Sequence, residues 1–277
     1  MSVLKKLLNF YINSSIHVAL SVYSLTWLTL IEFDISYDEH VLYFIFYATI
    51  TGYNFVKYFG IAKFHHRSLT NWLKSIQLFS FFCFLLMCYY GLQLNKITLF
   101  YIAVFGIVTF LYAIPFLPKR LFLDSQHNLR SIGGLKIYLI GLVWSGVTVF
   151  LPLINNDYFI NADVILTGVQ RYIFIIVLML PFEIRDLRYD SLKLSTVPQK
   201  IGVKQTKAIG VILLLVFFFL EFFKNDIMLS EILILLIITV FTLLLLVYSK
   251  IEQRKYYSAL WVEGLPILWL VMMLLFN

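Results

Sequence analysis

The amino-acid sequence predicts an all-α integral membrane protein with nine spanning helices, and three observations carry that prediction. The first is composition: 61% of the 277 residues are hydrophobic and 13% are charged, and the mean hydropathy is +0.87, far from the values of soluble domains. The second is length, because a spanning helix needs about 20 mostly apolar residues, and a chain of this size holds nine with little left over. The third is the alternation of charge between the connections.

Apolar windows between charged breaks place the predicted helices along the chain. In order, they cover residues 16–32, 41–61, 75–92, 97–117, 135–154, 164–182, 207–223, 230–248 and 259–276. No internal repeat or low-complexity linker separates them. We therefore expect residues 1–277 to form a single polytopic membrane domain.

The connections between these windows differ in charge. Of the 22 Lys and Arg residues, all except Lys96, Arg171 and Lys224 lie at the N-terminus or in every second connection, whereas the connections after the first, fifth and seventh windows are acidic. Because Lys and Arg concentrate in cytoplasmic loops, we expect a cytoplasmic N-terminus and a C-terminus on the opposite side. A miscounted span would move later basic connections to the wrong face, so the pattern supports nine. Since the basic residues set orientation, the net charge of +7 indicates membrane lipid and not nucleic acid as a partner.

The strongest chemical signal follows the sixth window, in the sequence PFEIRDLRYD at residues 181–190. If the helix continues through this run, Glu183, Asp186 and Asp190 share one face, because they are three and four residues apart. Like charges so arranged are costly unless a cation neutralises them, and carboxylate oxygens suit Mg²⁺, which commonly bridges carboxylates to substrate phosphates. The alternative is a solvated helix end whose acids pair with the neighbouring arginines and Lys193.

Several segments together identify a family. Residues 183–190, with the TVP and IG sequences that follow them, are similar to a second Asp-rich motif, and LYAIP at residues 111–115 is similar to an L-Y-S-x-P motif at the end of a fourth helix. GLK at residues 134–136 matches the start of a fifth helix, and WVEGL at residues 261–265 matches a D-G motif of the last helix, with Glu263 in place of Asp. In this order the segments resemble the UbiA superfamily of intramembrane prenyltransferases, from about residue 50 to the end.

The resemblance implies nine helices around a central cavity and the transfer of a prenyl group from a polyprenyl diphosphate to a small aromatic or lipid-like acceptor. The family holds Mg²⁺ against the diphosphate with Asp-rich motifs on helices two and six. The resemblance therefore implies that Asp186 and Asp190 bind the metal and, with Glu183, act in catalysis. Tyr112 and Lys136 lie in matching motifs and are expected to contact the substrate, although Lys136 could instead anchor its helix at the membrane surface.

The first Asp-rich motif departs from the family pattern. Its N-x-x-x-D-x-x-x-D spacing matches Asn54, Tyr58 and Ala62, and no Asp or Glu occurs from residue 41 to 123. Lys57 follows Asn54 by three residues, so a helix places both on one face. We expect both to meet the diphosphate, with weaker leaving-group activation, since an ammonium carries one charge where Mg²⁺ carries two. The alternative is that Lys57 only helps to set orientation.

Two further charged residues lie inside predicted spans. An intramembrane arginine such as Arg171 usually faces a cavity or a partner, which predicts a substrate role, or alternatively pairing with Asp163. Glu263 lies where a carboxylate is costly and is expected to orient the acceptor. The sequence thus predicts a Mg²⁺-assisted membrane prenyltransferase. The alternative is a non-catalytic UbiA-like protein that binds a lipid diphosphate or serves as a membrane assembly subunit.

Overall fold

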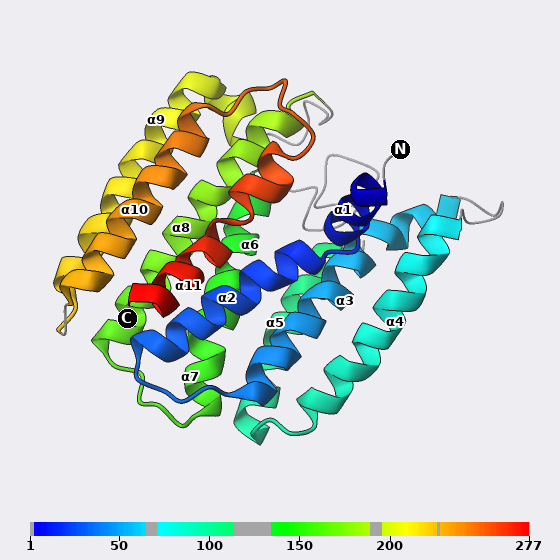
Figure 1. Ribbon diagram of the computed structural model, residues 1–277, viewed down its shortest axis with the longest axis horizontal. Helices are drawn as coiled ribbons and strands as arrows, with labels where there is room; N and C mark the ends of the chain where they lie inside the picture. The colour runs from blue at the N-terminus through cyan, green and yellow to red at the C-terminus, as the bar shows by residue number, and fades with distance from the viewer. Residues whose placement is uncertain (1–2, 65–70, 114–133, 189–195, 226–227, 277) are drawn as a thin grey trace, which may run out of the picture.

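The computed structural model describes residues 3–64, 71–113, 134–188, 196–225 and 228–276, and every regular element within them is a helix (Figure 1). Six of these helices are long and apolar enough to cross a membrane, or seven if one bent pair counts as a single span. These findings confirm the predicted all-α class, and the helices are those of a multi-pass membrane protein.

The first half of the chain forms five helices. α1 (Val3–Asn13) and α2 (Ile16–Glu32) meet at a bend of 56°, and α3 (Glu39–Phe64), α4 (Asn71–Gly91) and α5 (Lys96–Ala113) follow. α3 packs against both α2 and α4. In Figure 1 these three helices, α3 to α5, lie together on one side of α2.

The next helix is composite. α6 (Leu135–Ser145), the π-helical η3 (Gly146–Phe150) and α7 (Leu151–Asn155) run on without a break and fill the fifth predicted window. Gly134 precedes α6 with a φ of 78°, a left-handed conformation that glycine adopts without steric cost. This turn directs the first residues of α6, including Lys136, toward α8, against which α6 packs.

α8 (Ala162–Asp186) is the central helix of the second half. It begins at Asn161, whose side chain accepts a hydrogen bond from the Val164 amide at 3.0 Å. α9 (Val197–Phe219) packs against it and continues into the 3₁₀ turn η5 (Leu220–Phe223). Gly202 interrupts α9 with a φ of 81°, which again favours glycine.

The chain ends with α10 (Leu229–Val247), the π-helical η6 (Tyr257–Val262) and α11 (Leu265–Phe276). α11 packs against both α10 and α2, so the last helix closes onto one of the first, as Figure 1 shows. This contact brings the junction of η6 and α11 next to the start of α2.

Buried threonines of α2 find hydrogen-bond partners within the helix. Thr26 and Thr29 each donate their hydroxyl to the carbonyl four residues earlier, at 2.9 and 3.2 Å. Such bonds satisfy side chains inside a helix where water is absent. α2 can therefore lie in the interior of an apolar bundle.

Helices occupy each of the nine predicted windows within the described chain, although residues 114–117 of the fourth window lie outside it. Among the described residues, six or seven helices satisfy the length and hydropathy expected of a span. The count of nine and the orientation stay predictions. The sequence did not predict α1 as a separate helix, because its apolar residues run into the first window with only a short polar interruption.

Candidate functional site

The last turn of α8 carries two carboxylates that converge on one lysine. The Nζ of Lys136 lies 3.2 Å from Oε1 of Glu183 and 3.6 Å from Oδ2 of Asp186. Glu183 is buried, whereas Asp186 and Lys136 are partly exposed. The structure thus brings together three residues that the sequence assigned to the site, from the end of α8 and the start of α6.

Arg185 supplies a second cation to Asp186. Its Nη2 lies 2.7 Å from Oδ1 of Asp186, and its Nε donates a hydrogen bond to the same oxygen at 2.8 Å. The guanidinium also lies over the ring of Phe182, 5.2 Å from its centroid. Each oxygen of Asp186 therefore faces a cation. Pairing with a neighbouring arginine was the alternative expected from the sequence, and Lys136 adds a partner from another helix.

The described residues include only part of the predicted metal site. α8 ends at Asp186, with Leu187 as its C-cap, so this helix does not carry its acidic face as far as Asp190. Asp190 and Lys193 lie outside the described residues. In the part of the chain that is described, no group of three or more His, Cys, Asp or Glu is arranged to hold a metal ion. The Mg²⁺ site at Asp186 and Asp190 stays a prediction.

Asn54, at the start of the degenerate first motif, is buried and fully bonded to protein. Its Nδ2 donates to the backbone oxygen of Ser14 at 2.9 Å and to Oγ of Ser80 at 2.7 Å. Its Oδ1 accepts from Oγ of Ser15 at 2.8 Å. Ser14 and Ser15 form the bend between α1 and α2, and Ser15 has a φ of 65°. Asn54 therefore holds this bend.

The next two positions of the motif make contacts of the same kind. Nζ of Lys57 donates to Oγ of Ser15 at 2.8 Å, and the hydroxyl of Tyr58 donates to the backbone oxygen of Asn13 at 3.0 Å. At the first acid position of the family pattern, this chain thus has Tyr58, which binds the α1–α2 bend. The Lys57 side chain nevertheless keeps exposed surface.

Glu263 connects the two clusters electrostatically. It lies between η6 and α11, where its charge interacts with Lys57 and with Arg185. Its backbone oxygen accepts the hydroxyl of Ser21. Lys57 on α3, Glu263 at the η6–α11 junction and the Arg185–Asp186 ion pair on α8 are therefore electrostatically coupled.

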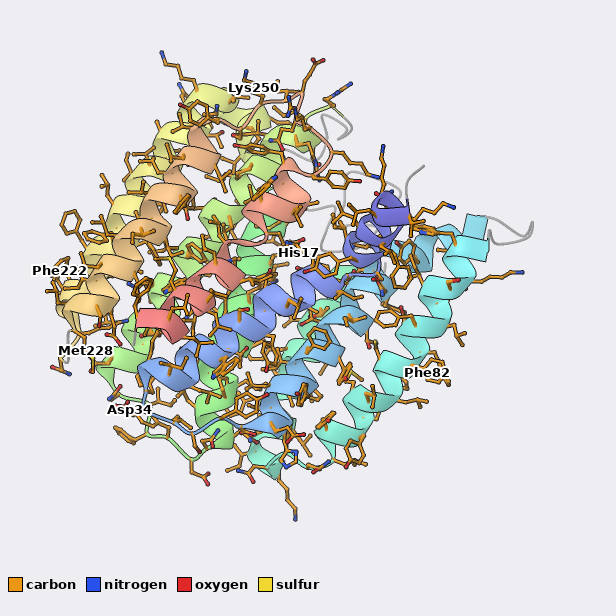
Figure 2. All side chains as sticks on the ribbon, viewed as in Figure 1. His17, Asp34, Phe82, Phe222, Met228 and Lys250 are labelled. Carbon is orange, nitrogen blue, oxygen red and sulfur yellow. The ribbon has the colours of Figure 1, made fainter. Side chains whose placement is uncertain are left out.

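His17 fixes the same junction from α2 (Figure 2). One ring nitrogen, Nε2, lies 2.9 Å from the backbone oxygen of Leu260, and the other, Nδ1, lies 2.8 Å from the hydroxyl of Tyr11. Because a carbonyl only accepts, Nε2 carries a proton, and neutral His17 accepts from Tyr11 at Nδ1. Sequence reasoning missed Ser15, His17 and Tyr11. The available signal was the run of polar residues within the apolar N-terminal segment.

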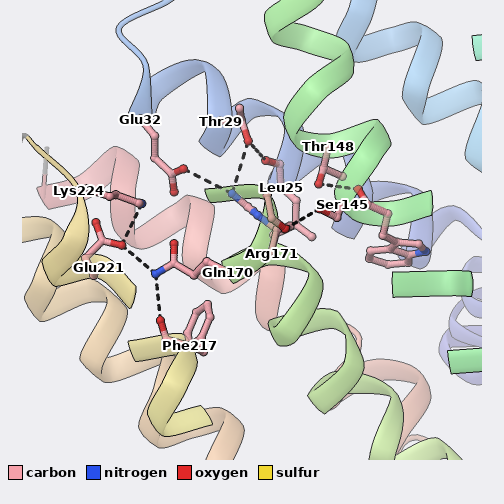
Figure 3. Close-up of polar contacts among 12 residues, drawn as sticks. Leu25, Thr29, Glu32, Ser145, Thr148, Gln170, Arg171, Phe217, Glu221 and Lys224 are labelled. Atoms are coloured by element: carbon pink, nitrogen blue, oxygen red, sulfur yellow. Dashed lines mark hydrogen bonds and ion pairs between the residues drawn. The ribbon is translucent and has the colours of Figure 1, made fainter. Parts of the chain in front are cut away.

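Arg171 lies in the N-terminal half of α8, in a different environment (Figure 3). Its side chain is fully buried, with Nη2 3.6 Å from Oε2 of Glu32 and 3.5 Å from Oγ1 of Thr29. The guanidinium lies 5.0 Å from the ring centroid of Trp269. The predicted acid partner was Asp163, but Asp163 instead accepts hydrogen bonds from Asn225.

A second buried pair extends the cluster around Arg171. Nε2 of Gln170 donates to Oε2 of Glu221 at 2.9 Å and to the backbone oxygen of Phe217 at 3.0 Å, and Nζ of Lys224 lies 2.9 Å from the same Glu221 oxygen. Figure 3 shows both pairs side by side between α2, α8 and the end of α9. Arg171 is therefore separated from the Asp186 cluster by most of the length of α8. Tyr112 lies in the last turn of α5, and its side chain is outside the described residues.

Comparison with known proteins identifies the fold. No protein-family model and no curated protein matches the sequence. A solved structure of a digeranylgeranylglyceryl phosphate synthase in membranes, a UbiA-superfamily prenyltransferase, is similar with a TM-score of 0.57 and 14% sequence identity. The match covers 98% of this chain and 96% of that one. The likeness confirms that the chain has a UbiA-type fold over nearly its whole length.

Proposed function

We propose that this protein is a membrane prenyltransferase that moves a prenyl group from a polyprenyl diphosphate to a small aromatic or lipid-like acceptor and releases diphosphate. The full-length likeness in fold to a UbiA-type enzyme supports this proposal. So does the charged cluster at the end of α8, at the position of the family's second Asp-rich motif. We further propose that nine spans enclose a cavity that opens on the cytoplasmic side.

The observation that carries the proposal is the convergence of Glu183 and Asp186 on Lys136, with 3.2 Å and 3.6 Å between the charged atoms. Carboxylates held this close repel one another, and a cation between them removes that cost. A diphosphate adds negative charge to the same place. A metal ion could take the place of the Lys136 ammonium between the two carboxylates, and Lys136 could then bind the diphosphate.

The residues present are compatible with Mg²⁺. Carboxylate oxygens of Glu183 and Asp186 approach a common point, now taken by the ammonium of Lys136, and hard oxygen ligands are the ones that Mg²⁺ prefers. We propose that Asp186 and Asp190 hold the ion, supported by Glu183. When bound, Mg²⁺ would neutralise charge on the departing diphosphate.

The remaining charged groups have proposed roles toward the two substrates. Lys136 and Lys57 donate to diphosphate oxygens, which take the electron pair as the allylic carbon–oxygen bond breaks. Asn54, whose amide is already bonded, positions Lys57 through Ser15. Glu263 orients the acceptor that attacks the allylic carbon.

Diphosphate release by the purified full-length protein tests the proposal. Geranyl, farnesyl and geranylgeranyl diphosphate are supplied in turn with Mg²⁺ and a panel of quinol-type and lipid alcohol acceptors. We expect release with at least one pair and a loss of about a hundredfold or more in Asp186→Asn, the range for removing one electrostatic contact to a transition state. Asp163→Asn, the same change at the other end of α8, is the matched control and should retain activity.

Two outcomes would contradict different parts of the proposal. Release that is unchanged in Asp186→Asn would exclude this site while leaving the activity. No release from any donor would exclude catalysis.

A non-catalytic lipid-diphosphate binder is the second candidate. The contacts of Asn54, Lys57 and Tyr58 with the α1–α2 bend favour it, because these side chains are engaged in holding the bend and Tyr58 stands where the family pattern has an acid. Binding of radiolabelled farnesyl diphosphate that depends on Asp186, without any turnover, would support this candidate over the first.

A further inference from the structure

Within the described residues, the N-terminal helix α1 makes its polar and aromatic contacts with the rest of the protein through one of its halves. Asn9 accepts hydrogen bonds from Lys255 at 2.6 Å and from Tyr256 at 2.9 Å. Phe10 contacts Phe79 with 5.8 Å between ring centroids, and Tyr11 bonds to His17. All these contacts come from residues 9–13. The bend at Ser15, held by α3, then fixes the direction in which the helix leaves the bundle.

The other half of α1 exposes large apolar side chains. Val3, Leu4 and Leu7 are 74%, 76% and 62% exposed, and they lie on one face because they are separated by one, three and four residues. No residue of α1 is fully buried, and within the described chain nothing covers these three. Unlike the exposed apolar residues of the spans, they belong to a helix too short to cross a bilayer.

The charged residues of α1 are all basic. Lys5 and Lys6 are exposed and lie with Asn9 and Asn13 on the polar face of the helix, and no acidic residue occurs in the chain before Glu32. An amphipathic helix with lysines on one face and leucines on the other binds in the plane of a membrane surface, with added affinity for anionic lipid. The bend of 56° turns α1 away from the path of α2, as an in-plane position requires.

We infer that α1 is an in-plane anchor seated on an anionic membrane surface. Val3, Leu4 and Leu7 enter the boundary between headgroups and acyl chains, and Lys5 and Lys6 face lipid phosphates. The bend contacts of Asn54 and Lys57 join this anchor to the helix that carries the degenerate motif. The inference does not depend on the proposed catalytic activity.

A fluorescent probe on the exposed face tests the inference. An environment-sensitive nitrobenzoxadiazole group is attached at Leu4→Cys in full-length protein whose Cys83 and Cys88 are replaced by Ala and Ser. The protein is placed in nanodiscs of phosphatidylcholine, with or without phosphatidylglycerol. We expect a blue-shifted, brighter signal with phosphatidylglycerol, and its partial reversal by salt, which screens surface charge.

Charge variants make the test specific. Lys5→Gln with Lys6→Gln should shift the equilibrium between seated and detached α1 by about thirtyfold in anionic nanodiscs, the value for two lysines at such a surface. Lys200→Gln with Lys204→Gln removes the same charge from exposed positions on α9 and should leave the signal unchanged. A water-like signal in both nanodiscs would overturn the inference. A blue-shifted signal that changes neither with phosphatidylglycerol nor with the two lysine substitutions would also overturn it. That result would mean that another part of the chain or a second copy covers the apolar face of α1.

Discussion

The two ends of α8 carry similar charges in opposite settings. Near its C-terminal end, Lys136 and Asp186 have side chains 21% and 20% exposed. Near its N-terminal end, Arg171 has a side chain 1% exposed, held between Glu32 and Trp269. Each cluster joins α8 to another helix by an ion pair. The difference is access to solvent: the Asp186 cluster is partly exposed, and the Arg171 side chain is enclosed by protein.

This comparison changes how a charge inside a membrane sequence is interpreted. Arg171 drew a functional expectation because ionisable residues in spans usually mark substrate paths. In the structure its partners come from α2 and α11, so the Arg171 side chain joins α8 to these two helices. A charge in a span therefore supports a proposed site only where its neighbours leave it accessible, and Asp186 keeps such exposure.

The largest expected effect follows from breaking the closed cluster. Arg171→Met keeps the approximate volume of the side chain but leaves the Glu32 carboxylate, whose side chain is only 14% exposed, without its cation. Removing one partner of a buried ion pair typically costs ~3–5 kcal/mol, and we expect a loss of that size in the free energy of unfolding. Reversible unfolding in mixed micelles measures it.

The double variant Arg171→Met, Glu32→Gln separates pairing from packing. It should recover most of the loss, because no unpaired charge remains. A single variant as stable as the parent would show that Arg171 is not a structural tie.

The open cluster should respond in activity instead of stability. Lys136→Met removes the cation between Glu183 and Asp186, and we expect diphosphate release to fall by about a hundredfold. The cost in unfolding free energy should be smaller than for Arg171→Met, because the site is partly exposed and can admit water or a metal ion. Lys200→Met, an exposed lysine on α9, is the control. Unchanged release in Lys136→Met would remove this residue from the proposed site.

The fold could be predicted from the sequence much further than the site. Windows of apolar residues and alternating basic connections depend on local composition, and helices fill each window. The pairing of Lys136 with Glu183 could not be predicted, because it depends on how the start of α6 meets the end of α8. Motif resemblance placed both residues near a diphosphate, but gave no contact between them.

The α1–α2 bend shows a second limit of sequence reasoning. Asn54 and Lys57 were expected on one helix face, and both do reach the same group, the hydroxyl of Ser15. Their partner is 39 and 42 residues away in the chain, and no periodicity links positions at that separation. A polar Ser14-Ser15 pair in an apolar segment was the local signal for a helix break, but it does not indicate what binds there.

A smaller effect is expected where the degenerate motif meets the bend. Lys57→Met should reduce diphosphate release by about tenfold, since one ammonium is lost from a site that keeps other cations. Ser15→Ala removes the hydroxyl that holds Lys57 but leaves the ammonium in the site, and should reduce release by less than Lys57→Met does. Equal losses in the two variants would mean that Lys57 only holds the bend.

The smallest effect is expected at Arg185, and it tests whether access alone separates the two ends of α8. Its side chain is 32% exposed, and its ion pair with Asp186 is between neighbours in sequence. Because solvent screens such pairs, Arg185→Gln should change the free energy of unfolding by less than about 1 kcal/mol. Arg185→Gln and Arg171→Met are unfolded under the same conditions, so that their losses of unfolding free energy can be compared. A cost at Arg185 as large as at Arg171 would mean that the end of α8 is as closed as its beginning, and the proposed headgroup site would then lack an entrance.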